Sequence, residues 1–359
     1  MIRAFSAPGK LFVAGEYGVL WGGTARVCAV GPRSHSAAIQ RRDRVVELLF
    51  PHGALRGQST RLGVNWERAP VESERFAARA ADLAYAALGR DAPGVALALG
   101  PSPVGPAGQK LGLGGSARTV ALVAESVRSC LEAKFDALKV ALLAHWDAQG
   151  QRGSGADVAA IVVGGLVSYQ RYAVEGLFDA FTRGEFASAL RDAPPVSLRR
   201  LGPLRLASSW IWSGRAASTP GLVAQAEGAL SPASRLQFGS RSDELGAQLE
   251  LAFERREAAR AIEVTSALDA LLREIPGTAT EALDQIRAAV ASFGGASKPS
   301  GAGGGDGAWA VFPSAEAQAA VHATLAHRGF YCVAVEPDVG LRGEPLADPT
   351  LSAWLDTQG

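Results

Sequence analysis

The sequence predicts an α+β protein built from two lobes. Strand-like and helical segments alternate through the first half of its 359 residues, whereas most of the second half has helical patterns. A strand–helix–strand pattern near the C-terminus indicates a small sheet backed by helices. A chain of this length is long enough for two compact units, so we expect an α+β class in two lobes.

The first lobe is expected to combine a sheet with helices. Runs rich in Val, Leu and Phe predict strands at residues 10–14, 25–30, 45–50 and 94–99. Helical patterns predict helices at residues 72–88, from Ser116 onward, and through 135–146. The helix after Ser116 is supported by apolar residues at helical spacing, namely Val120, Val123, Ala124, Val127 and Leu131.

A Pro- and Arg-rich stretch at residues 192–203 marks a boundary, so we place the lobes at 1–192 and 193–359. The elements predicted beyond it are a strand at 204–212, a long helical stretch at 243–274, a helix around 283–293 closed by Gly294, a strand at 308–312, a helix at 314–327 and a last strand at 330–336.

Composition limits the classes of function. The chain is 48% hydrophobic and 20% charged with a formal net charge of +1, which predicts a globular protein without a nucleic-acid partner. The longest apolar stretch, residues 158–167, is too short to span a bilayer, and Pro8 interrupts the N-terminus before a signal-like segment. We therefore expect a cytoplasmic protein without a membrane partner. The three cysteines and five histidines form no zinc or disulfide pattern.

Residues 112–126, GLGGSARTVALVAES, allow two interpretations. Glycines let the backbone approach a ligand, and the N–H groups that begin a helix attract an anion such as phosphate. The alternative is a glycine turn before a helix that has Ser116 as its N-cap. The stretch lacks both the Walker A pattern and the G-x-G-x-x-G spacing of a Rossmann dehydrogenase, which disfavours those classes.

Four glycine-containing stretches occur in order: APGKLFVAGEYGVLWGG at 7–23, the loop at 112–117, GSGADVAA at 153–160 and SGAGGGD at 300–306. Together they resemble the GHMP kinases, the small-molecule kinases named for galactokinase, homoserine, mevalonate and phosphomevalonate kinases. PGKLFVAGEY resembles the first motif of the family, KLGLGGSA the second, usually written P-x-x-x-G-L-G-S-S-A, and SGAGGGD the third. The resemblance covers the chain from Ala7 to about Glu336.

This resemblance implies the two-lobed GHMP kinase fold. The N-terminal lobe, 1–192, is expected to resemble domain 2 of ribosomal protein S5 and to bind ATP. The C-terminal lobe, 193–359, is expected to be ferredoxin-like and to complete the substrate cleft. The GEY of the first motif, GSGADVAA, WSGRAAST at 212–219 and KPSGAGGGD make the phosphomevalonate kinases the most similar branch. That branch implies ATP-dependent phosphorylation of 5-phosphomevalonate to 5-diphosphomevalonate, in the mevalonate route to isoprenoids.

Other activities stay open. The nearest alternative is another GHMP kinase that acts on an alcohol, either mevalonate or a sugar phosphate. Diphosphomevalonate decarboxylases lack the lysine of the first motif and homoserine kinases lack the middle aspartate, whereas this chain has Lys10 and Asp157. A catalytically silent ligand sensor on the same scaffold would not need Lys10, Ser116 and Asp157 together. The protein is expected to be a monomer or a homodimer that acts on a small molecule.

The resemblance assigns roles to particular residues. ATP is expected on the residues of the phosphate loop, which are Gly112, Leu113, Gly114, Gly115, Ser116 and Ala117, and Ser116 is the implied ligand of Mg²⁺. Asp157 resembles the catalytic aspartate of the family, and Lys10 resembles its partner. The second pKa of a phosphate is about 6, so a phosphate acceptor is largely deprotonated already. We therefore expect Asp157 to orient the acceptor more than to act as a base, and Lys10 to relieve repulsion between two anions.

Both lobes are expected to contact the substrate. The implied residues are Lys10, Tyr17, Ser154, Ser213, Lys298, Ser300, Gly301 and Ala302. Arg215 is a further candidate cation, and Asp306 is expected to fix the last glycine loop. Simpler roles are also open: Lys10 as a surface charge, Asp157 as a helix N-cap, and Tyr17 as a core residue.

The chain departs from the family pattern in the phosphate loop and at the metal site. Gly115 replaces the first serine of G-L-G-S-S-A, so we expect altered nucleotide affinity rather than loss of function. Arg118 occupies a position that is usually small, and it either lies near the nucleotide phosphates or points into solvent. The carboxylate that is a second Mg²⁺ ligand in mevalonate kinases has no clear counterpart, because counting back from Asp157 leads to Trp146, with Asp147 adjacent.

Overall fold

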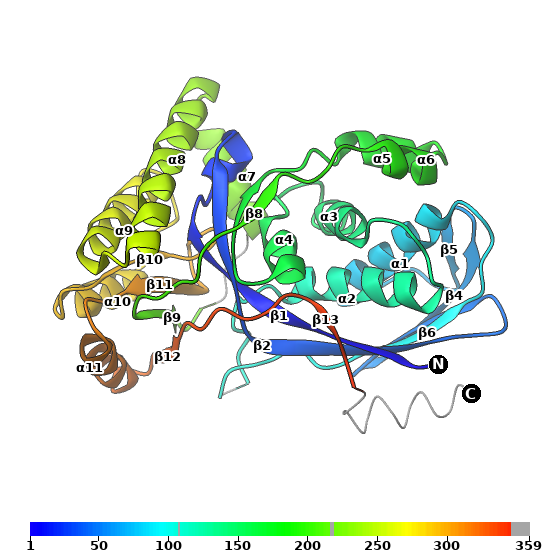
Figure 1. Ribbon diagram of the computed structural model, residues 1–359, viewed down its shortest axis with the longest axis horizontal. Helices are drawn as coiled ribbons and strands as arrows, with labels where there is room; N and C mark the ends of the chain where they lie inside the picture. Colours follow the sequence, from blue (N-terminus) through cyan, green and yellow to red (C-terminus); the bar gives the residue numbers. More distant parts are fainter. Residues whose placement is uncertain (107, 216–218, 346–359) are drawn as a thin grey trace.

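A computed structural model describes residues 1–106, 108–215 and 219–345 (Figure 1). The strands are β1 (Arg3–Ala14), β2 (Thr24–Gln40), β3 (Val45–Phe50), β4 (Gly53–Thr60), β5 (Gly63–Trp66), β6 (Val95–Leu99), β7 (Leu166–Gln170), β8 (Leu198–Arg200), β9 (Ser208–Trp212), β10 (Ala296–Pro299), β11 (Gly307–Val311), β12 (Tyr331–Ala334) and β13 (Arg342–Glu344). The helices are α1 (Arg75–Leu88), α2 (Gly115–Cys130), α3 (Ala137–Ala148), α4 (Ala156–Val163), α5 (Glu175–Thr182), α6 (Phe186–Asp192), α7 (Thr219–Ala229), α8 (Pro232–Arg255), α9 (Ala258–Leu272), α10 (Glu281–Ala291) and α11 (Ala315–Ala326), with a 3₁₀ turn at Gly18–Trp21.

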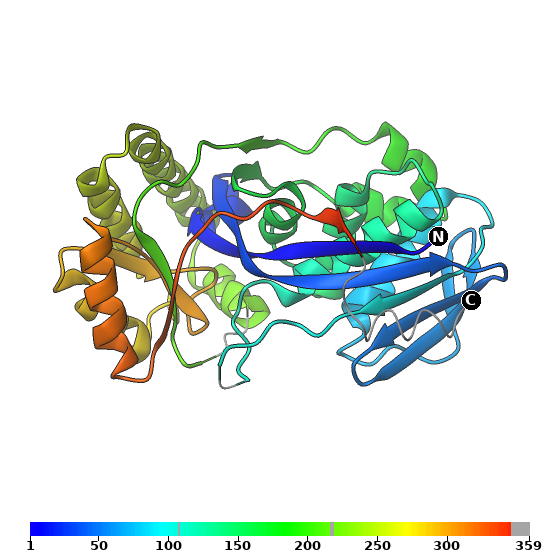
Figure 2. The same ribbon diagram turned by 60° about the horizontal axis from the view of Figure 1, so that its bottom comes forward.

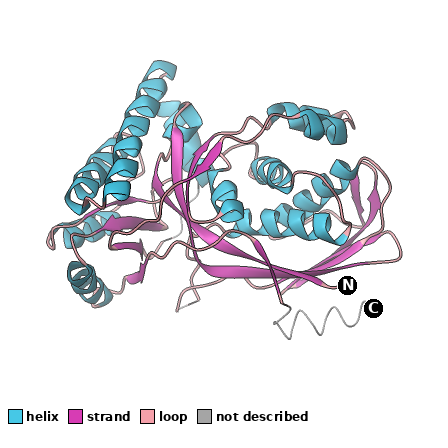
Figure 3. Cartoon of the chain, in the orientation of Figure 1, coloured by secondary structure: helices cyan, strands magenta, loops and turns pink. Residues whose placement is uncertain are grey.

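The larger sheet supports the helices that carry the N-terminal motifs. Its strands follow the order β13-β1-β2-β6-β3-β4-β5, and β7 and β8 extend it from β2. Helices α1, α2 and α4 cover one face of this sheet, and α3 packs on these helices (Figure 3). Alanine and valine fill most buried positions of α1 and α2, so these helices can pack closely on each other and on the strands.

The smaller sheet belongs to the C-terminal half and is antiparallel, in the order β10-β11-β9-β12. Side chains of α10 and α11 pack on one face, around Ile211 and Phe312. Side chains of α8 and α9 pack with the other face, where the Phe253 ring meets the Trp309 ring edge-on at 6.2 Å. The predicted small sheet backed by helices is therefore confirmed.

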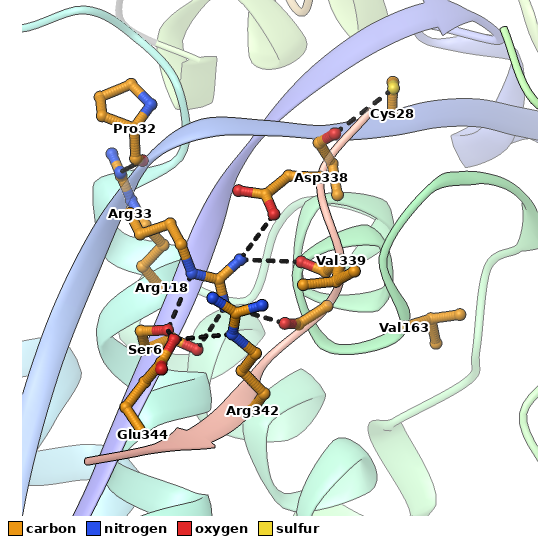
Figure 4. A network of polar contacts seen from close by, with 12 residues as sticks. Ser6, Cys28, Pro32, Arg33, Arg118, Val163, Asp338, Val339, Arg342 and Glu344 are labelled. Atoms are coloured by element: carbon orange, nitrogen blue, oxygen red, sulfur yellow. Dashed lines mark hydrogen bonds and ion pairs between the residues drawn. The ribbon is translucent and has the colours of Figure 1, made fainter. Parts of the chain in front are cut away.

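The C-terminal segment returns from the smaller sheet to the larger one, where β13 pairs with β1 (Figure 2). Arg33 of β2 holds this segment. Its guanidinium donates hydrogen bonds to the Asp338 carboxylate and to the carbonyl oxygens of Val339 and Gly340, each at 2.9 Å (Figure 4). The returning segment thus contacts both sheets, and the division of the lobes after residue 192 stays a prediction.

Several boundaries differ from the sequence-based prediction. The helical stretch at 243–274 is two helices, because Arg256 adopts a left-handed φ of 58° that ends α8. The strand at 25–30 is part of the longer β2, and β12 is followed by a further strand, β13. The patterns do not predict β4 and β5, whose residues include few of the Val, Leu and Phe runs that mark the other strands. Within the described ranges, every helix is too short or too polar to cross a membrane.

Candidate active site

The loop before α2 has a backbone suited to binding an anion. Gly112 and Gly114 have φ angles of 68° and 82°, in the left-handed region that favours glycine. Gly114 is the N-cap of α2, so Ser116 is the second residue of the helix, and the interpretation of Ser116 as N-cap is wrong. The first N–H groups of a helix have no partner within it and carry a partial positive charge. The loop can therefore hold a phosphate through its main chain.

Lys10, on β1, lies against this loop. Its ammonium donates a 3.2 Å hydrogen bond to the carbonyl oxygen of Gly112, and its backbone N–H donates to the carbonyl oxygen of Leu113 at 3.1 Å. A Cβ added to Gly114 would lie 2.9 Å from Cγ of Lys10, so the lysine stem packs directly on the loop. These contacts do not fit the alternative role of Lys10 as a simple surface charge.

Asp157 lies in the first turn of α4. The N-cap of this helix is Gly155, with φ 78°, so Asp157 is not the cap. Its Oδ1 accepts a 2.9 Å hydrogen bond from the N–H of Val158, and its side chain is 19% exposed. Ser154 precedes the helix, and its hydroxyl accepts a hydrogen bond from the N–H of Ala156 at 3.2 Å. The remaining oxygen of Asp157, Oδ2, faces α3.

His145 of α3 is the side chain that Asp157 faces, and the motifs do not point to it. Its Nε2 lies 3.6 Å from Oδ2 of Asp157 and 3.1 Å from Oγ of Ser116. His145 therefore joins the phosphate loop to the middle motif. The signal in the sequence is that His145 directly precedes Trp146, the position that corresponds to the second Mg²⁺ ligand of mevalonate kinases.

Trp146 and Asp147, the positions considered for a second Mg²⁺ ligand, contact other helices. Asp147 forms an ion pair with Arg79 of α1, and the Trp146 ring packs edge-on against Phe178 at 5.7 Å. Trp146 and Asp147 thus serve packing between helices. Among the residues that the structure describes, no group of three His, Cys, Asp or Glu side chains is placed to hold a metal ion.

The last glycine loop meets the N-terminal motif. The Tyr17 hydroxyl donates a 2.7 Å hydrogen bond to the carbonyl oxygen of Ala302, and the Ser300 hydroxyl accepts one from the N–H of Phe12 at 2.9 Å. Tyr17 is buried, and burial together with the nearby Glu16 carboxylate raises the pKa of its phenol. Tyr17 is therefore both a core residue and part of the cleft wall.

Lys298 lies deeper than the sequence suggests. It is 1% exposed, and its ammonium donates hydrogen bonds to the Glu16 carboxylate and, at 2.9 Å, to the carbonyl oxygen of Pro299. Burial lowers the pKa of Lys298, and the Glu16 carboxylate opposes that shift. Glu16, which no motif-based role covers, lies between Lys298 and the cleft.

Ser213 and Asp306 link the segment after β9 to the last glycine loop. The N–H of Ser213 donates to the carbonyl oxygen of Asp306 at 2.8 Å, and the N–H of Asp306 donates to that of Arg215 at 2.6 Å. A Cβ on Gly112 would lie 2.6 Å from Cγ of Asp306, so this carboxylate touches the phosphate loop. The rest of the predicted WSGRAAST segment, residues 216–218, lies outside the described residues.

Burial of Arg118 contradicts one of the two sequence-based expectations for its position. It is 3% exposed and lies on the face of α2 that packs on β2, where its guanidinium donates a 2.8 Å hydrogen bond to the carbonyl oxygen of Pro32 (Figure 4). Burial lowers its pKa to about 10. Arg118 therefore does not point into solvent, and its nearness to the nucleotide phosphates stays a prediction.

One cleft is lined by six of the predicted site residues, whereas the phosphate loop, Ser213, Lys298 and Ser300 are not part of its lining. It has about 620 Å³ of empty space, open to solvent. The predicted residues that line it are Lys10, Tyr17, Ser154, Asp157, Gly301 and Ala302, and those not predicted include Glu16, His145 and Gln149. Ser116 reaches this lining through His145, whereas Lys298 lies behind it through Glu16.

Comparison with known proteins relates the chain to small-molecule kinases. Phosphomevalonate kinase from Streptomyces sp. (strain CL190) is 31% identical over 330 residues, 84% of this chain and 87% of that protein. A solved Lin0012 protein from Listeria innocua has a TM-score of 0.84 at 23% identity, covering 96% of this chain and 99% of that one. Streptococcus pneumoniae phosphomevalonate kinase, in complex with phosphomevalonate and AMPPNP, has a TM-score of 0.77 at 22% identity, covering 92% and 99%. No family model matches the chain.

The α+β fold is that of the GHMP kinases. The 31% identity to the Streptomyces protein narrows this class to one kinase family. The chain belongs to the phosphomevalonate kinase family. The fold class and the family resemblance stated from the motifs are thus confirmed.

Proposed function

We propose that this protein phosphorylates 5-phosphomevalonate with ATP, forming 5-diphosphomevalonate and ADP. The observation that carries the proposal is that Lys10 and Asp157 line one cleft, while the phosphate loop contacts Lys10 and, through Ser116, the His145 ring of the same lining. Ser116 lies 3.1 Å from His145. The Streptomyces relative and the complex of the S. pneumoniae enzyme support the choice of acceptor and of nucleotide.

The main chain of the phosphate loop would hold the ATP phosphates. The first turn of α2 offers its N–H groups, and the left-handed glycines keep side chains out of the way. An oxygen of the acceptor phosphate then attacks the γ-phosphorus, and the bond from that phosphorus to the β–γ bridging oxygen breaks, so that ADP leaves. This reaction needs alignment and charge neutralisation more than covalent help from the protein.

Lys10 and Asp157 would divide the work at the acceptor. Lys10 already places its ammonium at the phosphate loop, bonded to the Gly112 carbonyl oxygen, where it can neutralise both phosphate groups as they approach. Asp157 would orient the acceptor, because a phosphate at neutral pH is largely deprotonated and needs little help from a base. Tyr17, Ser154, Gly301 and Ala302 would line the acceptor site.

The residues present fit a Mg²⁺ ion. Ser116 Oγ and Asp157 Oδ2 both lie within 3.6 Å of the same nitrogen, His145 Nε2, and such hard oxygen donors, completed by substrate phosphates and water, are the ligands that Mg²⁺ prefers. In this proposal Ser116 holds the ion, which supplies positive charge to the β- and γ-phosphates. A cytoplasmic location and a monomeric or homodimeric state stay predictions.

A panel of acceptors tests the proposal. ADP release is measured with ATP and Mg²⁺ in the presence of 5-phosphomevalonate, mevalonate, or sugars and their phosphates. We expect ADP with 5-phosphomevalonate in large excess over the others, and phosphorus NMR of the product should show a diphosphate. Faster ADP release with mevalonate or a sugar phosphate would favour another GHMP kinase activity, and no release with any acceptor would favour a ligand sensor.

A further inference from the structure

His145 connects two parts of the site that are separate in the sequence. Its ring comes from α3, whereas Ser116 is on α2 and Asp157 is on α4. The side chain of His145 is 4% exposed, and its ring packs against that of Phe76 with 5.5 Å between centroids. A buried ring held in this way has little freedom to turn, so the position of Nε2 is well defined.

The arrangement is not a nucleophile–base–acid triad. In such a triad the acid and the nucleophile lie on opposite nitrogens of the imidazole. Here both oxygens face Nε2, with Oγ of Ser116 at 3.1 Å and Oδ2 of Asp157 at 3.6 Å. A bare lone pair on Nε2 would be directed at a carboxylate oxygen, so the carboxylate favours the tautomer that carries its hydrogen on Nε2.

We propose that His145 is a positioning residue that fixes the Ser116 hydroxyl relative to Asp157. With hydrogen on Nε2, the ring donates to Ser116 Oγ and leaves the serine O–H and a lone pair directed toward the cleft. The same hydrogen faces Asp157 Oδ2 and limits rotation of that carboxylate. This inference rests on the proposed phosphoryl transfer, because it states how the nucleotide side and the acceptor side of that reaction are kept in line.

Two polar substitutions separate this role from packing. Glutamine can place an amide nitrogen close to the position of Nε2, whereas asparagine reaches about as far as Nδ1. Both remove the ring contact with Phe76, so a packing role predicts equal losses. We expect His145→Asn to lower kcat about ten- to a hundredfold, since small errors of alignment have effects of that size, and His145→Gln to recover most of it. The KM for 5-phosphomevalonate should change less than kcat in both variants.

The chain offers a matched control. His322 of α11 also pairs through Nε2 with a serine, Ser209 Oγ at 2.6 Å, but it lies in the smaller sheet's layer, outside the cleft lining. His322→Asn and His322→Gln should leave kcat unchanged within about twofold, whatever they do to the thermal midpoint. A second measurement uses Ser116→Ala, in which His145→Asn should have little further effect on kcat.

The results separate the inference from the proposed function. Wild-type protein that transfers no phosphate to 5-phosphomevalonate contradicts the function itself. With active wild-type protein, the inference is overturned if His145→Asn keeps kcat, if the Asn and Gln variants lose it equally, or if both fail to fold. It is supported if Gln exceeds Asn and the difference disappears in the Ser116→Ala background.

Discussion

The buried ammonium of Lys298 donates a hydrogen bond to the carboxylate of Glu16, 282 positions earlier in the chain. Lys298 belongs to β10 and Glu16 follows β1, so this ion pair joins the two halves of the protein beneath the cleft. Removing one member of a buried ion pair leaves a charge without compensation, at a cost of about 3–5 kcal/mol. Glu16 also lines the cleft, where an uncompensated carboxylate would repel anionic substrates.

Lys298→Met should therefore lower both the free energy of unfolding and the affinity for 5-phosphomevalonate. We expect a loss of about 3 kcal/mol in urea unfolding and a raised KM for the acceptor. Glu16→Gln combined with Lys298→Met removes both charges and should recover much of the stability. A double variant as unstable as the sum of the two single variants would show that the pair is not coupled.

Lys10 and Asp157 are expected to differ in their contributions to kcat. Lys10→Met removes the cation at the phosphate loop and should lower kcat about 10²- to 10³-fold, as loss of one electrostatic contact in a transition state does. Asp157→Asn keeps the shape and one hydrogen-bond acceptor, so we expect a smaller loss. Steady-state kinetics with saturating ATP measure both. A Lys10→Met variant with near-normal kcat contradicts the assignment, and an Asp157→Asn variant more impaired than Lys10→Met indicates that Asp157 is a base.

Residues that lie in short local motifs could be singled out from the sequence, and their roles stay predictions. Lys10, Ser116 and Asp157 each lie in a short motif with its own glycines, and the cleft brings those motifs together. Glu16 lies in a motif too, but its role depends on Lys298, and no pattern within either segment records that contact. His145 has no glycine motif around it, because its contacts with Ser116 and Asp157 arise from the packing of three helices.

Arg118 shows a different limit of sequence reasoning. Arginine is seldom buried, so its residue type favours contact with a ligand or with solvent. Its position in the second turn of α2 instead faces β2, and among the described residues its Nε has no hydrogen-bond partner. The burial of Arg118 depends on its packing against β2, and the residue type alone does not indicate that tertiary contact.

Two neighbouring glycines of the phosphate loop should differ in their tolerance of an added side chain. Gly114→Ala forces a left-handed φ of 82° on alanine and brings its Cβ within 2.9 Å of Lys10 Cγ. Such a backbone costs about 1–2 kcal/mol, and displacement of Lys10 adds to it. We expect kcat/KM to fall about tenfold or more, with reduced thermal stability.

Gly115→Ser is the matched control for that substitution. The nearest atom to an added Cβ at Gly115 is Oγ of Ser102, at 3.7 Å, and its φ is not in the left-handed region. The variant restores the serine that the family usually has there, so it should fold like the wild type and change mainly the KM for ATP. A Gly115→Ser variant as damaged as Gly114→Ala would mean that the loop does not have the conformation described.

Asp82 should make the stability of the protein depend on pH. Burial raises the pKa of its carboxyl from 3.8 to about 7, against the opposing effects of Arg79 and of the hydrogen bond from Trp66 Nε1, while the nearby Asp147 adds to the rise. The folded protein therefore binds this proton more tightly than the unfolded chain, whose carboxyl has its ordinary pKa near 4. It follows that the carboxyl of Asp82 lowers the free energy of unfolding progressively as the pH rises from about 4 to about 7, and that the full loss is present above pH 7.

Asp82→Asn removes the charge and keeps an oxygen that can accept from Trp66. We expect the variant to be more stable than the wild type by about 1–3 kcal/mol at pH 8, and this advantage should shrink at pH 5, where Asp82 of the folded wild type is largely protonated. Urea unfolding at the two pH values measures it. Asp91→Asn, at a surface ion pair with Arg44, is the control, and its small effect should not follow this pattern. If Asp82→Asn were equally stabilising at both pH values, or destabilising at pH 8, the raised pKa of Asp82 would be contradicted, because a carboxyl that is charged in the folded protein throughout this range gives its neutral replacement no advantage that grows with pH.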